Sequence, residues 1–309
     1  MRIVVHGQQA FGKSVLEALL ERGENVVGVY CAPDPAQGGR VDPLKEAALA
    51  RGLPVHQPKS FRNKPEVWEE FGRLKADLCV MAYVTLIVPE EVLNMPTRGT
   101  IQYHPSLLPL HRGPSSINWP IIQGETSTGL TIFWPDQGLD TGPILLQKEV
   151  EIRDTDTLGS LYFDRLFPMG VAALLEGVDL VRAGKAPKIV QDESKATYEG
   201  WCKKEHVQVD WQKPVRTTWN LIRGADPQPG AWTTFGGATV QLLDAKKLEG
   251  GAAGEPGQVL AIDDTGMTVA APGGRILVTR VRADGGQKVA AGAYAKSAGL
   301  AAGARLGTA

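Results

Sequence analysis

The sequence has few cysteines and no long apolar run. Three cysteines occur in 309 residues, far apart, which gives neither a disulfide framework nor zinc-ligand spacing and fits a reducing compartment. No stretch of about 18 apolar residues exists, and the opening MRIVVHGQQ lacks the apolar core of a signal peptide. We therefore expect a cytoplasmic protein rather than a secreted, fibrous or membrane-spanning one.

The sequence also lacks an excess of charge of either sign. Lys and Arg total 33 and Asp and Glu total 34, for a net charge of −1. A chain this balanced has no global attraction for nucleic acid or for an anionic membrane, although a local patch remains possible. With 43% hydrophobic and 22% charged residues, it is typical of a soluble globular protein, and its length suggests two domains.

The first part of the chain alternates short apolar runs with helical patterns. Apolar side chains from Phe11 to Leu20 recur at helical spacing, and Pro43–Arg51 and Pro65–Lys75 are also compatible with helices. Strands that alternate with helices of this length predict parallel β-strands joined by helical crossovers, an α/β fold. The predicted strands are Arg2–His6, Val26–Cys31, Leu53–His56, Asp77–Ala82 and Thr100–Tyr103.

The pattern changes after residue 128. Gly129–Phe133 and Ile144–Val150 resemble strands joined by a polar loop, and Leu158–Ala183 predicts one long helix or two. Residues 186–205 are polar and predict a linker, and a short helix is expected near Pro214–Arg223. Five short strands punctuated by Gly-Gly pairs then suggest a small barrel or sandwich. They are Ala231–Phe235, Thr239–Leu243, Gly257–Ala261, Gly266–Ala271 and Arg275–Val281.

A glycine motif near the start invites a nucleotide-binding interpretation. Residues 7–14 (GQQAFGKS) satisfy the pattern of a phosphate-binding loop between a strand and a helix. The residues between its glycines include the bulky Gln8, Gln9 and Phe11, which do not let backbone amides wrap a phosphate. A tight strand-to-helix turn is therefore favoured.

Two polar segments are better candidates for chemistry. His104 directly follows a predicted strand, and ligands of open parallel sheets bind beyond the carboxyl ends of the strands. The loop Pro135–Gly142 contains Asp140. A loop carboxylate beside a strand-end histidine fixes the imidazole and favours its protonated form, as acid–base chemistry requires. Taken singly, the histidine could equally be a structural group and the acidic loop a solvated turn.

These two segments carry a family resemblance. The run His-Pro-Ser-Leu-Leu-Pro-x-x-Arg-Gly from His104, followed by Asp-x-Gly-x-Ile-Leu-x-Gln from Asp140, resembles the folate-dependent formyltransferases. Within that family, Ile117–Trp119, Leu145–Glu149 and Ala196–Gly200 are similar to the hydrolase domain of the 10-formyltetrahydrofolate dehydrogenases. The likeness runs over essentially the whole chain and lowers the phosphate-loop interpretation again.

The resemblance implies a catalytic trio. Family members use Asn-x-His and a distant Asp to move or release a formyl group, and His104 and Asp140 match two of these positions. Gln102 stands where most members have Asn, and its amide could donate a similar hydrogen bond from one methylene further out. Attack on the formyl carbon creates an oxyanion that protonated His104 would stabilise, while Asp140 would orient or deprotonate the attacking group.

The resemblance also implies a folate site and a domain organisation. The folate contacts are expected from an apolar loop, a stiff turn and an acidic loop, although core packing is an equally good interpretation of any one side chain. They are Leu86, Ile87 and Val88, then Ser106, Leu107, Leu108 and Pro109, and finally Asp136. Residues 1–185 are expected to form a Rossmann-like catalytic domain, 186–205 the linker and 206–309 an OB-like β-barrel. No metal is expected.

Several functions remain open. The first is hydrolysis of 10-formyltetrahydrofolate to tetrahydrofolate and formate. The second is formyl transfer to a small amine, a thiol carrier or another protein module. Transfer to methionyl-tRNA is a third, which is disfavoured because residues 205–309 hold 11 basic and 9 acidic side chains, a net charge of only +2.

A binding or scaffold module with a decayed site is the non-enzyme alternative, and Gln102 is its only support. We expect any carrier or dehydrogenase module that works with this chain to lie on another chain, so NADP-dependent oxidation is not expected here.

Overall fold

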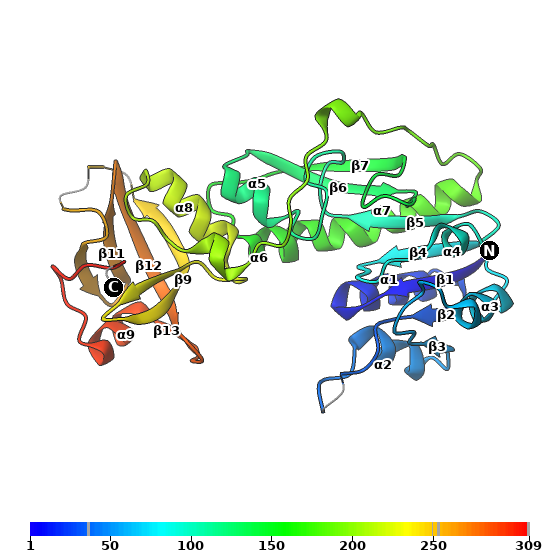
Figure 1. Ribbon diagram of the computed structural model, residues 1–309, viewed down its shortest axis with the longest axis horizontal. Helices are drawn as coiled ribbons and strands as arrows, with labels where there is room; N and C mark the ends of the chain where they lie inside the picture. The colour runs from blue at the N-terminus through cyan, green and yellow to red at the C-terminus, as the bar shows by residue number, and fades with distance from the viewer. Residues whose placement is uncertain (36–37, 249, 252–253, 308–309) are drawn as a thin grey trace. The chain divides into compact units, whose positions relative to one another are not determined.

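The computed structural model describes residues 1–309 apart from 36–37, 249, 252–253 and 308–309 (Figure 1). It divides into two compact units that interleave along the sequence. Each unit is made of three separate stretches of the chain, whereas the predicted domains divide the chain only at residues 185 and 206. Unit 1 comprises Met1–Gly113, Gly129–Val150 and Arg165–Tyr198, and unit 2 comprises Pro114–Thr128, Glu151–Asp164 and Glu199–Ala309.

Unit 1 is built on a seven-stranded sheet in the order β3-β2-β1-β4-β5-β6-β7. The pairs β1–β2, β1–β4, β2–β3 and β4–β5 are parallel, whereas β5–β6 is antiparallel. This confirms the predicted α/β fold with a mostly parallel sheet. The strands are β1 (Arg2–Gly7), β2 (Asn25–Tyr30), β3 (Val55–His56), β4 (Leu78–Ala82), β5 (Thr100–His104), β6 (Ser127–Phe133) and β7 (Ile144–Glu151).

Helices cover both faces of this sheet. On one face, Phe11 and Leu19 of α1 and Leu174 of α7 belong to one buried apolar cluster with the strands. On the other face, Phe71 of α3 packs with Tyr30, Met81 and their neighbours. Each such side chain contributes roughly 1.5–3 kcal/mol when fully buried. The helices are α1 (Gln9–Glu21), α2 (Pro43–Ala50), α3 (Pro65–Arg73), α4 (Glu90–Leu93) and α7 (Phe167–Arg182).

The turn between β1 and α1 is closed by the protein's own groups. The N–H of Gln9 donates to both carboxylate oxygens of Asp42, at 3.0 and 2.9 Å, and the same carboxylate accepts the N–H of Leu44 in the first turn of α2. At Gly7, a Cβ atom would lie 2.2 Å from the carbonyl oxygen of Ala82. The glycine motif therefore forms a tight strand-to-helix turn in which a carboxylate meets the start of α1.

The predicted long helix is a composite. It runs through α6 (Leu158–Ser160), a π-helical turn (Leu161–Leu166) and α7. By length and composition the stretch Leu158–Arg182 could cross a membrane. However, Ala173, Leu174 and Val178 are buried in the core of unit 1, and this burial accounts for the apolar side chains along α7.

Unit 2 contains a six-stranded antiparallel sheet in the order β10-β11-β12-β9-β8, with β13 paired to β12. This confirms the smaller antiparallel domain. The strands are β8 (Trp232–Phe235), β9 (Ala238–Leu248), β10 (Val259–Asp263), β11 (Gly266–Ala271), β12 (Gly274–Ala283) and β13 (Lys288–Ala290), and the helices are α5 (Asn118–Gln123), α8 (Val215–Gly224) and α9 (Ala291–Ala298).

The stretch 186–205 differs from the linker that its composition predicts. Residues up to Tyr198 belong to unit 1, and those from Glu199 belong to unit 2. Ile189 makes a short antiparallel bridge with Ile144 at the start of β7, and Gln191 is buried. Hydrogen bonds rather than aliphatic side chains fasten this stretch, so a search for apolar periodicity does not detect it.

Candidate active site

The two residues of the predicted Gln-x-His pattern, Gln102 and His104, point to one face of β5. Successive side chains of a strand alternate between faces, so Gln102 and His104 share a face and Tyr103 lies on the other. Tyr103 packs there against Phe11 of α1, with 4.4 Å between ring centroids. The sequence predicted that His104 directly follows the strand, whereas in the structure it is the last residue of β5. It still lies at the carboxyl edge of the sheet.

The imidazole of His104 is enclosed and touches two acceptors. The residue is 5% exposed. Its Nε2 lies 2.9 Å from the carbonyl oxygen of His111, and its Nδ1 lies 3.6 Å from Oδ2 of Asp140. A carbonyl and a carboxylate are both acceptors, so each side of the ring faces a group that an N–H can donate to.

Asp140 is equally enclosed. It is 6% exposed, and its Oδ2 accepts the backbone N–H of Gly113 at 2.9 Å. Its backbone adopts φ +58°, in the left-handed region that Asp tolerates better than most residues. The structure thus brings His104 and Asp140 together, from β5 and from the loop between β6 and β7.

Gln102 lies beside this pair without joining it. In the sheet it is opposite Met81 of β4 and Phe133 of β6, which share its face. Among the described residues, no hydrogen bond joins its amide to His104 or Asp140. The amide therefore acts on the pair only if a bound molecule bridges them, and its predicted catalytic role remains a prediction.

The turn after β5 is held by hydrogen bonds that leave little of it mobile. Thr131 of β6 donates its hydroxyl to the carbonyl of Ser106 at 2.7 Å and accepts the N–H of Leu108 at 3.0 Å. Ser106 donates its own hydroxyl to the carbonyl of Leu110. Ser106 and Leu108 are buried, and Leu107 and Pro109 are partly exposed. A hollow of about 680 Å³ lies against Leu107–Leu110, and neither His104 nor Asp140 lines it.

The other predicted folate contacts lie in two further loops. Leu86 and Val88 pack against the apolar cluster that contains Met81, whereas Ile87 is 73% exposed. Oδ1 of Asp136 accepts the N–H of Gly138 and the hydroxyl of Thr141, so this carboxylate shapes its own loop. Folate binding by these residues stays a prediction.

Beside the pair lies an ionic group that the sequence motifs did not single out as functional. Arg112 is 7% exposed and donates to Glu193 at 2.5 and 2.9 Å and to the side-chain oxygen of Gln191. The hydrogen bonds with Glu193 raise the pKa of Arg112 and lower the pKa of Glu193. The Arg-Gly dipeptide was visible within the family motif, whereas the isolated Gln191 had no signal in the sequence.

A metal centre has no support in the part of the chain that the structure describes. No group of three or more His, Cys, Asp or Glu side chains there could hold a metal ion. The arrangement at the edge of the sheet is instead an imidazole and a carboxylate, buried together and backed by main-chain groups. Such a pair can donate a proton, stabilise a developing negative charge and orient a nucleophile.

A buried imidazole and carboxylate at the carboxyl edge of a mostly parallel sheet form an arrangement that can carry acid–base chemistry, and family comparisons identify the class of protein. The family model "Formyl transferase" matches residues 1–176, and "Formyl transferase, C-terminal domain" matches 202–299. The chain belongs to the formyl transferase family, and the resemblance stated from the motifs is confirmed. The family supports formyl-group chemistry without distinguishing the reaction.

Individual relatives agree with this assignment. The chain is 39% identical over 315 residues to the cytosolic 10-formyltetrahydrofolate dehydrogenase of Xenopus tropicalis, an alignment that covers 98% of this chain and 35% of that protein. It is 39% identical to the methionyl-tRNA formyltransferase of Trichlorobacter lovleyi, covering 99% of this chain and 96% of that protein. It thus spans about a third of the dehydrogenase.

A solved structure shares the fold. HypX from Aquifex aeolicus, crystallised with tetrahydrofolic acid, superposes with a TM-score of 0.71 at 22% identity and covers 96% of this chain and 47% of that one.

Proposed function

We propose that this chain hydrolyses 10-formyltetrahydrofolate to tetrahydrofolate and formate. The observation that carries the proposal is the buried His104, whose two ring nitrogens face the His111 carbonyl and the Asp140 carboxylate. Support comes from the dehydrogenase relatives, which match along nearly the whole of this chain, and from the tetrahydrofolic acid bound to HypX.

The reaction requires one bond to form and one to break. A water oxygen adds to the formyl carbon, and the carbonyl oxygen becomes an oxyanion. Once its Nε2–H has turned from the His111 carbonyl to the substrate, the His104 imidazolium stabilises that charge and then gives a proton to N10 as the C–N10 bond breaks. Asp140 orients the water and accepts its proton. Formic acid forms and loses its proton to bulk water as formate, tetrahydrofolate leaves, and the proton held by Asp140 returns to His104.

The folate is expected to bind at the carboxyl edge of the sheet. Leu86 to Val88 would contact the pterin, together with the turn Ser106–Pro109 and the loop that begins at Asp136. Exposed apolar side chains such as Ile87 lose contact with water when a flat ring covers them, which favours binding. Gln102, on the same strand face as His104, would then donate its amide to the formyl oxygen.

Formyl transfer to methionyl-tRNA is the second candidate. The Trichlorobacter lovleyi relative supports it, because that alignment covers nearly the whole of both chains. The net charge of only +2 over residues 205–309 argues against it, since contacts with phosphates depend on Lys and Arg. Transfer to a small amine or to a thiol carrier uses the same two catalytic groups with a different nucleophile.

One assay separates these reactions. The chain is incubated with 10-formyltetrahydrofolate alone, then with methionyl-tRNA, a panel of amines or a thiol carrier, and tetrahydrofolate and formate are measured together. Hydrolysis predicts equal amounts of both products without an acceptor. Tetrahydrofolate that appears only with an acceptor, without formate, would overturn the hydrolase proposal in favour of transfer. Folate binding without either product would identify a binding module.

A further inference from the structure

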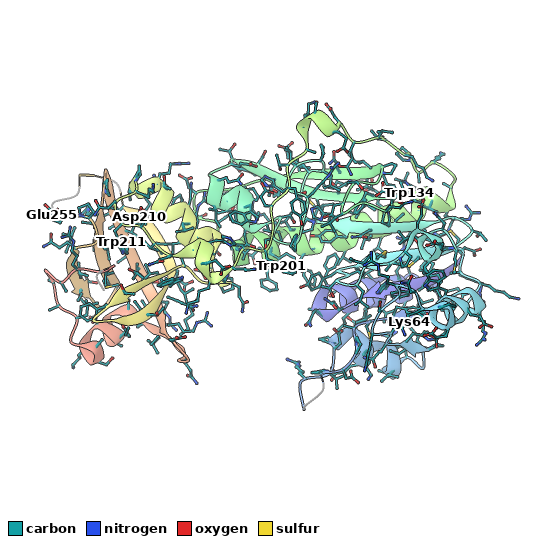
Figure 2. All side chains as sticks on the ribbon, in the orientation of Figure 1. Lys64, Trp134, Trp201, Asp210, Trp211 and Glu255 are labelled. Carbon is teal, nitrogen blue, oxygen red and sulfur yellow. The ribbon has the colours of Figure 1, made fainter. Side chains whose placement is uncertain are left out.

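Gln191 is a buried polar side chain outside the two catalytic motifs. It is 5% exposed and lies in the stretch that the sequence predicts to be a linker. Hydrogen bonds fasten the residues just before Gln191 to the sheet and its loops. The indole N–H of Trp134 (labelled in Figure 2) donates to the carbonyl of Pro187 at 2.8 Å, and Ile189 exchanges two hydrogen bonds with Ile144.

The orientation of the Gln191 amide is determined by its neighbours. Arg112 donates to its Oε1 from Nη2 at 2.8 Å and from Nε at 3.3 Å. Because a guanidinium has donors only, the oxygen of the amide must face it. The NH2 group then faces away from Arg112, and it donates to the carbonyls of Asp140 and Gly142 at 2.9 and 2.7 Å.

These contacts close a ring around Asp140. The guanidinium of Arg112 holds Gln191, Gln191 holds the main chain of Asp140, and the carboxylate of Asp140 accepts the N–H of Gly113, the residue that follows Arg112. Glu193 holds the outer side of the guanidinium. Asp140 is therefore fixed through both its side chain and its backbone.

The backbone of this loop has little freedom. At Gly142, a Cβ atom would lie 1.7 Å from the carbonyl oxygen of Trp134. Asp140 itself is held at φ +58°, a conformation that costs a non-glycine residue free energy unless neighbouring contacts maintain it. The two carbonyls that receive the Gln191 amide flank Thr141, so this one side chain spans the bend that directs the carboxylate to His104.

We propose that Gln191 is a positioning residue for the reaction, acting through Asp140. The proposal rests on the proposed function for its catalytic meaning. Gln191 holds the 140–142 backbone so that the carboxylate remains 3.6 Å from Nδ1 of His104. Misplacement of a catalytic group by about 1 Å can cost on the order of 100-fold in rate.

Two variants test the role of the amide. Gln191→Met removes the donor and the acceptor at similar length, and Gln191→Glu keeps an oxygen for Arg112 while removing the NH2 group. We expect both to lower kcat by about 10- to 100-fold and to change the KM for 10-formyltetrahydrofolate by less than about threefold, because none of the side chains expected to contact folate lies at residues 140–142. Gln287→Met, an exposed glutamine, is the matched control and should leave both constants unchanged.

A second readout does not depend on turnover. The titration of the His104 imidazole is followed by ¹⁵N NMR of histidine-labelled protein, with the signal assigned by its loss in His104→Asn. The carboxylate of Asp140 faces Nδ1 of this ring, and Arg112 interacts electrostatically with Asp140, Asp136 and Glu193. Asp140→Asn should lower the titration midpoint, because the imidazolium loses its carboxylate. Gln191→Met should lower the midpoint by less than Asp140→Asn does. The variant that carries both substitutions should have the same midpoint as Asp140→Asn alone.

Several results of these experiments would contradict the proposal. A wild-type titration midpoint in Gln191→Met would overturn the proposal even if activity fell. So would a Gln191→Met substitution that shifts the midpoint equally in wild type and in Asp140→Asn, since the effect would then not pass through Asp140. Wild-type kcat in Gln191→Glu would overturn it as well. The NMR cycle can succeed while the folate assay fails, and that combination would refute the proposed reaction and leave the positioning contact established.

Discussion

Nδ1 of His104 and Oδ2 of Asp140 lie 3.6 Å apart, although 36 positions separate the residues and both are more than nine-tenths buried. An isolated carboxylate at such a place would be costly. The backbone N–H of Gly113 offsets part of that cost, and a protonated His104 would supply a compensating charge. The pair therefore depends on both partners, and each can be tested separately.

Replacing Asp140 with Asn tests the charge at constant shape. Asn tolerates the positive φ of this position and can still accept the Gly113 N–H, so we expect the fold to persist. Formate release should fall by on the order of 10²- to 10⁴-fold, the range of acid–base contributions. Asp264→Asn, an exposed aspartate of unit 2, is the control. Near-normal turnover in Asp140→Asn would refute the assigned role.

Replacing His104 with Ala removes the proposed proton donor. Turnover should be abolished with little loss of folding, because the polar partners of the ring, the His111 carbonyl and the Asp140 carboxylate, belong to the loops at the edge of the sheet. Formate release and far-ultraviolet circular dichroism measure the two effects. His206→Ala removes an exposed imidazole of unit 2 and should keep full activity. A His104→Ala protein that still releases formate at the wild-type rate would rule out acid catalysis by this residue.

Gln102 tests the departure from the family trio. If its amide donates to the oxyanion, Gln102→Met should lower kcat by about 10²- to 10³-fold and leave the KM for folate nearly constant, since the bond strengthens in the transition state. Gln208→Met, another exposed glutamine of unit 2, serves as control. A Gln102→Met enzyme with unchanged kcat would assign this residue a packing role beside Met81 and Phe133.

His6 predicts a pH dependence of stability. Burial against Tyr30 and Phe61 lowers its pKa from 6.5 to about 3. Between these values the unfolded chain binds the proton and the folded chain does not, so the free energy of unfolding falls as the pH is lowered from about 6.5, by up to about 1.4 kcal/mol per pH unit. When urea unfolding is measured between pH 4.5 and 6.5, the free energy of unfolding of His6→Leu should change less with pH than that of wild type.

The matched comparison for His6 is His206→Leu, because His206 is exposed. That variant should retain the wild-type dependence of stability on pH. Equal slopes in wild type and His6→Leu would contradict the assignment of the acid sensitivity to the buried imidazole.

Gly7 tests the close approach of the first turn to β4. A methyl group there meets the Ala82 carbonyl at 2.2 Å, and backbone cannot move aside as a flexible side chain can. Gly7→Ala should therefore lower the free energy of unfolding by about 1–3 kcal/mol. Gly72→Ala in α3 has open space around it and should raise stability by about 0.5–1 kcal/mol. Urea titrations of both variants measure the contrast, and an unaltered Gly7→Ala protein would contradict it.

Local patterns were sufficient for most elements of both sheets. Val26 to Val29 are β-branched apart from Gly28, and Phe11, Val15 and Leu19 recur at helical spacing, so strand and helix follow from neighbouring residues. The small helix α9 and the strand β13 escaped prediction because Ala and Gly dominate their surroundings. Buried Ala291 and Ala295 pack against the antiparallel core, and such contacts leave no strong apolar pattern.

By itself the sequence determined that a histidine stands at the end of a buried strand, and that an aspartate follows in a turn-rich loop, because strand ends and turns depend on residues only a few positions apart. Only the tertiary structure decided which groups meet there. The His111 carbonyl reaches His104, and Gln191, 51 positions beyond Asp140, holds its loop. Such contacts depend on how distant loops pack at the edge of the sheet, and the pattern of residues a few positions apart in the sequence does not predict that packing.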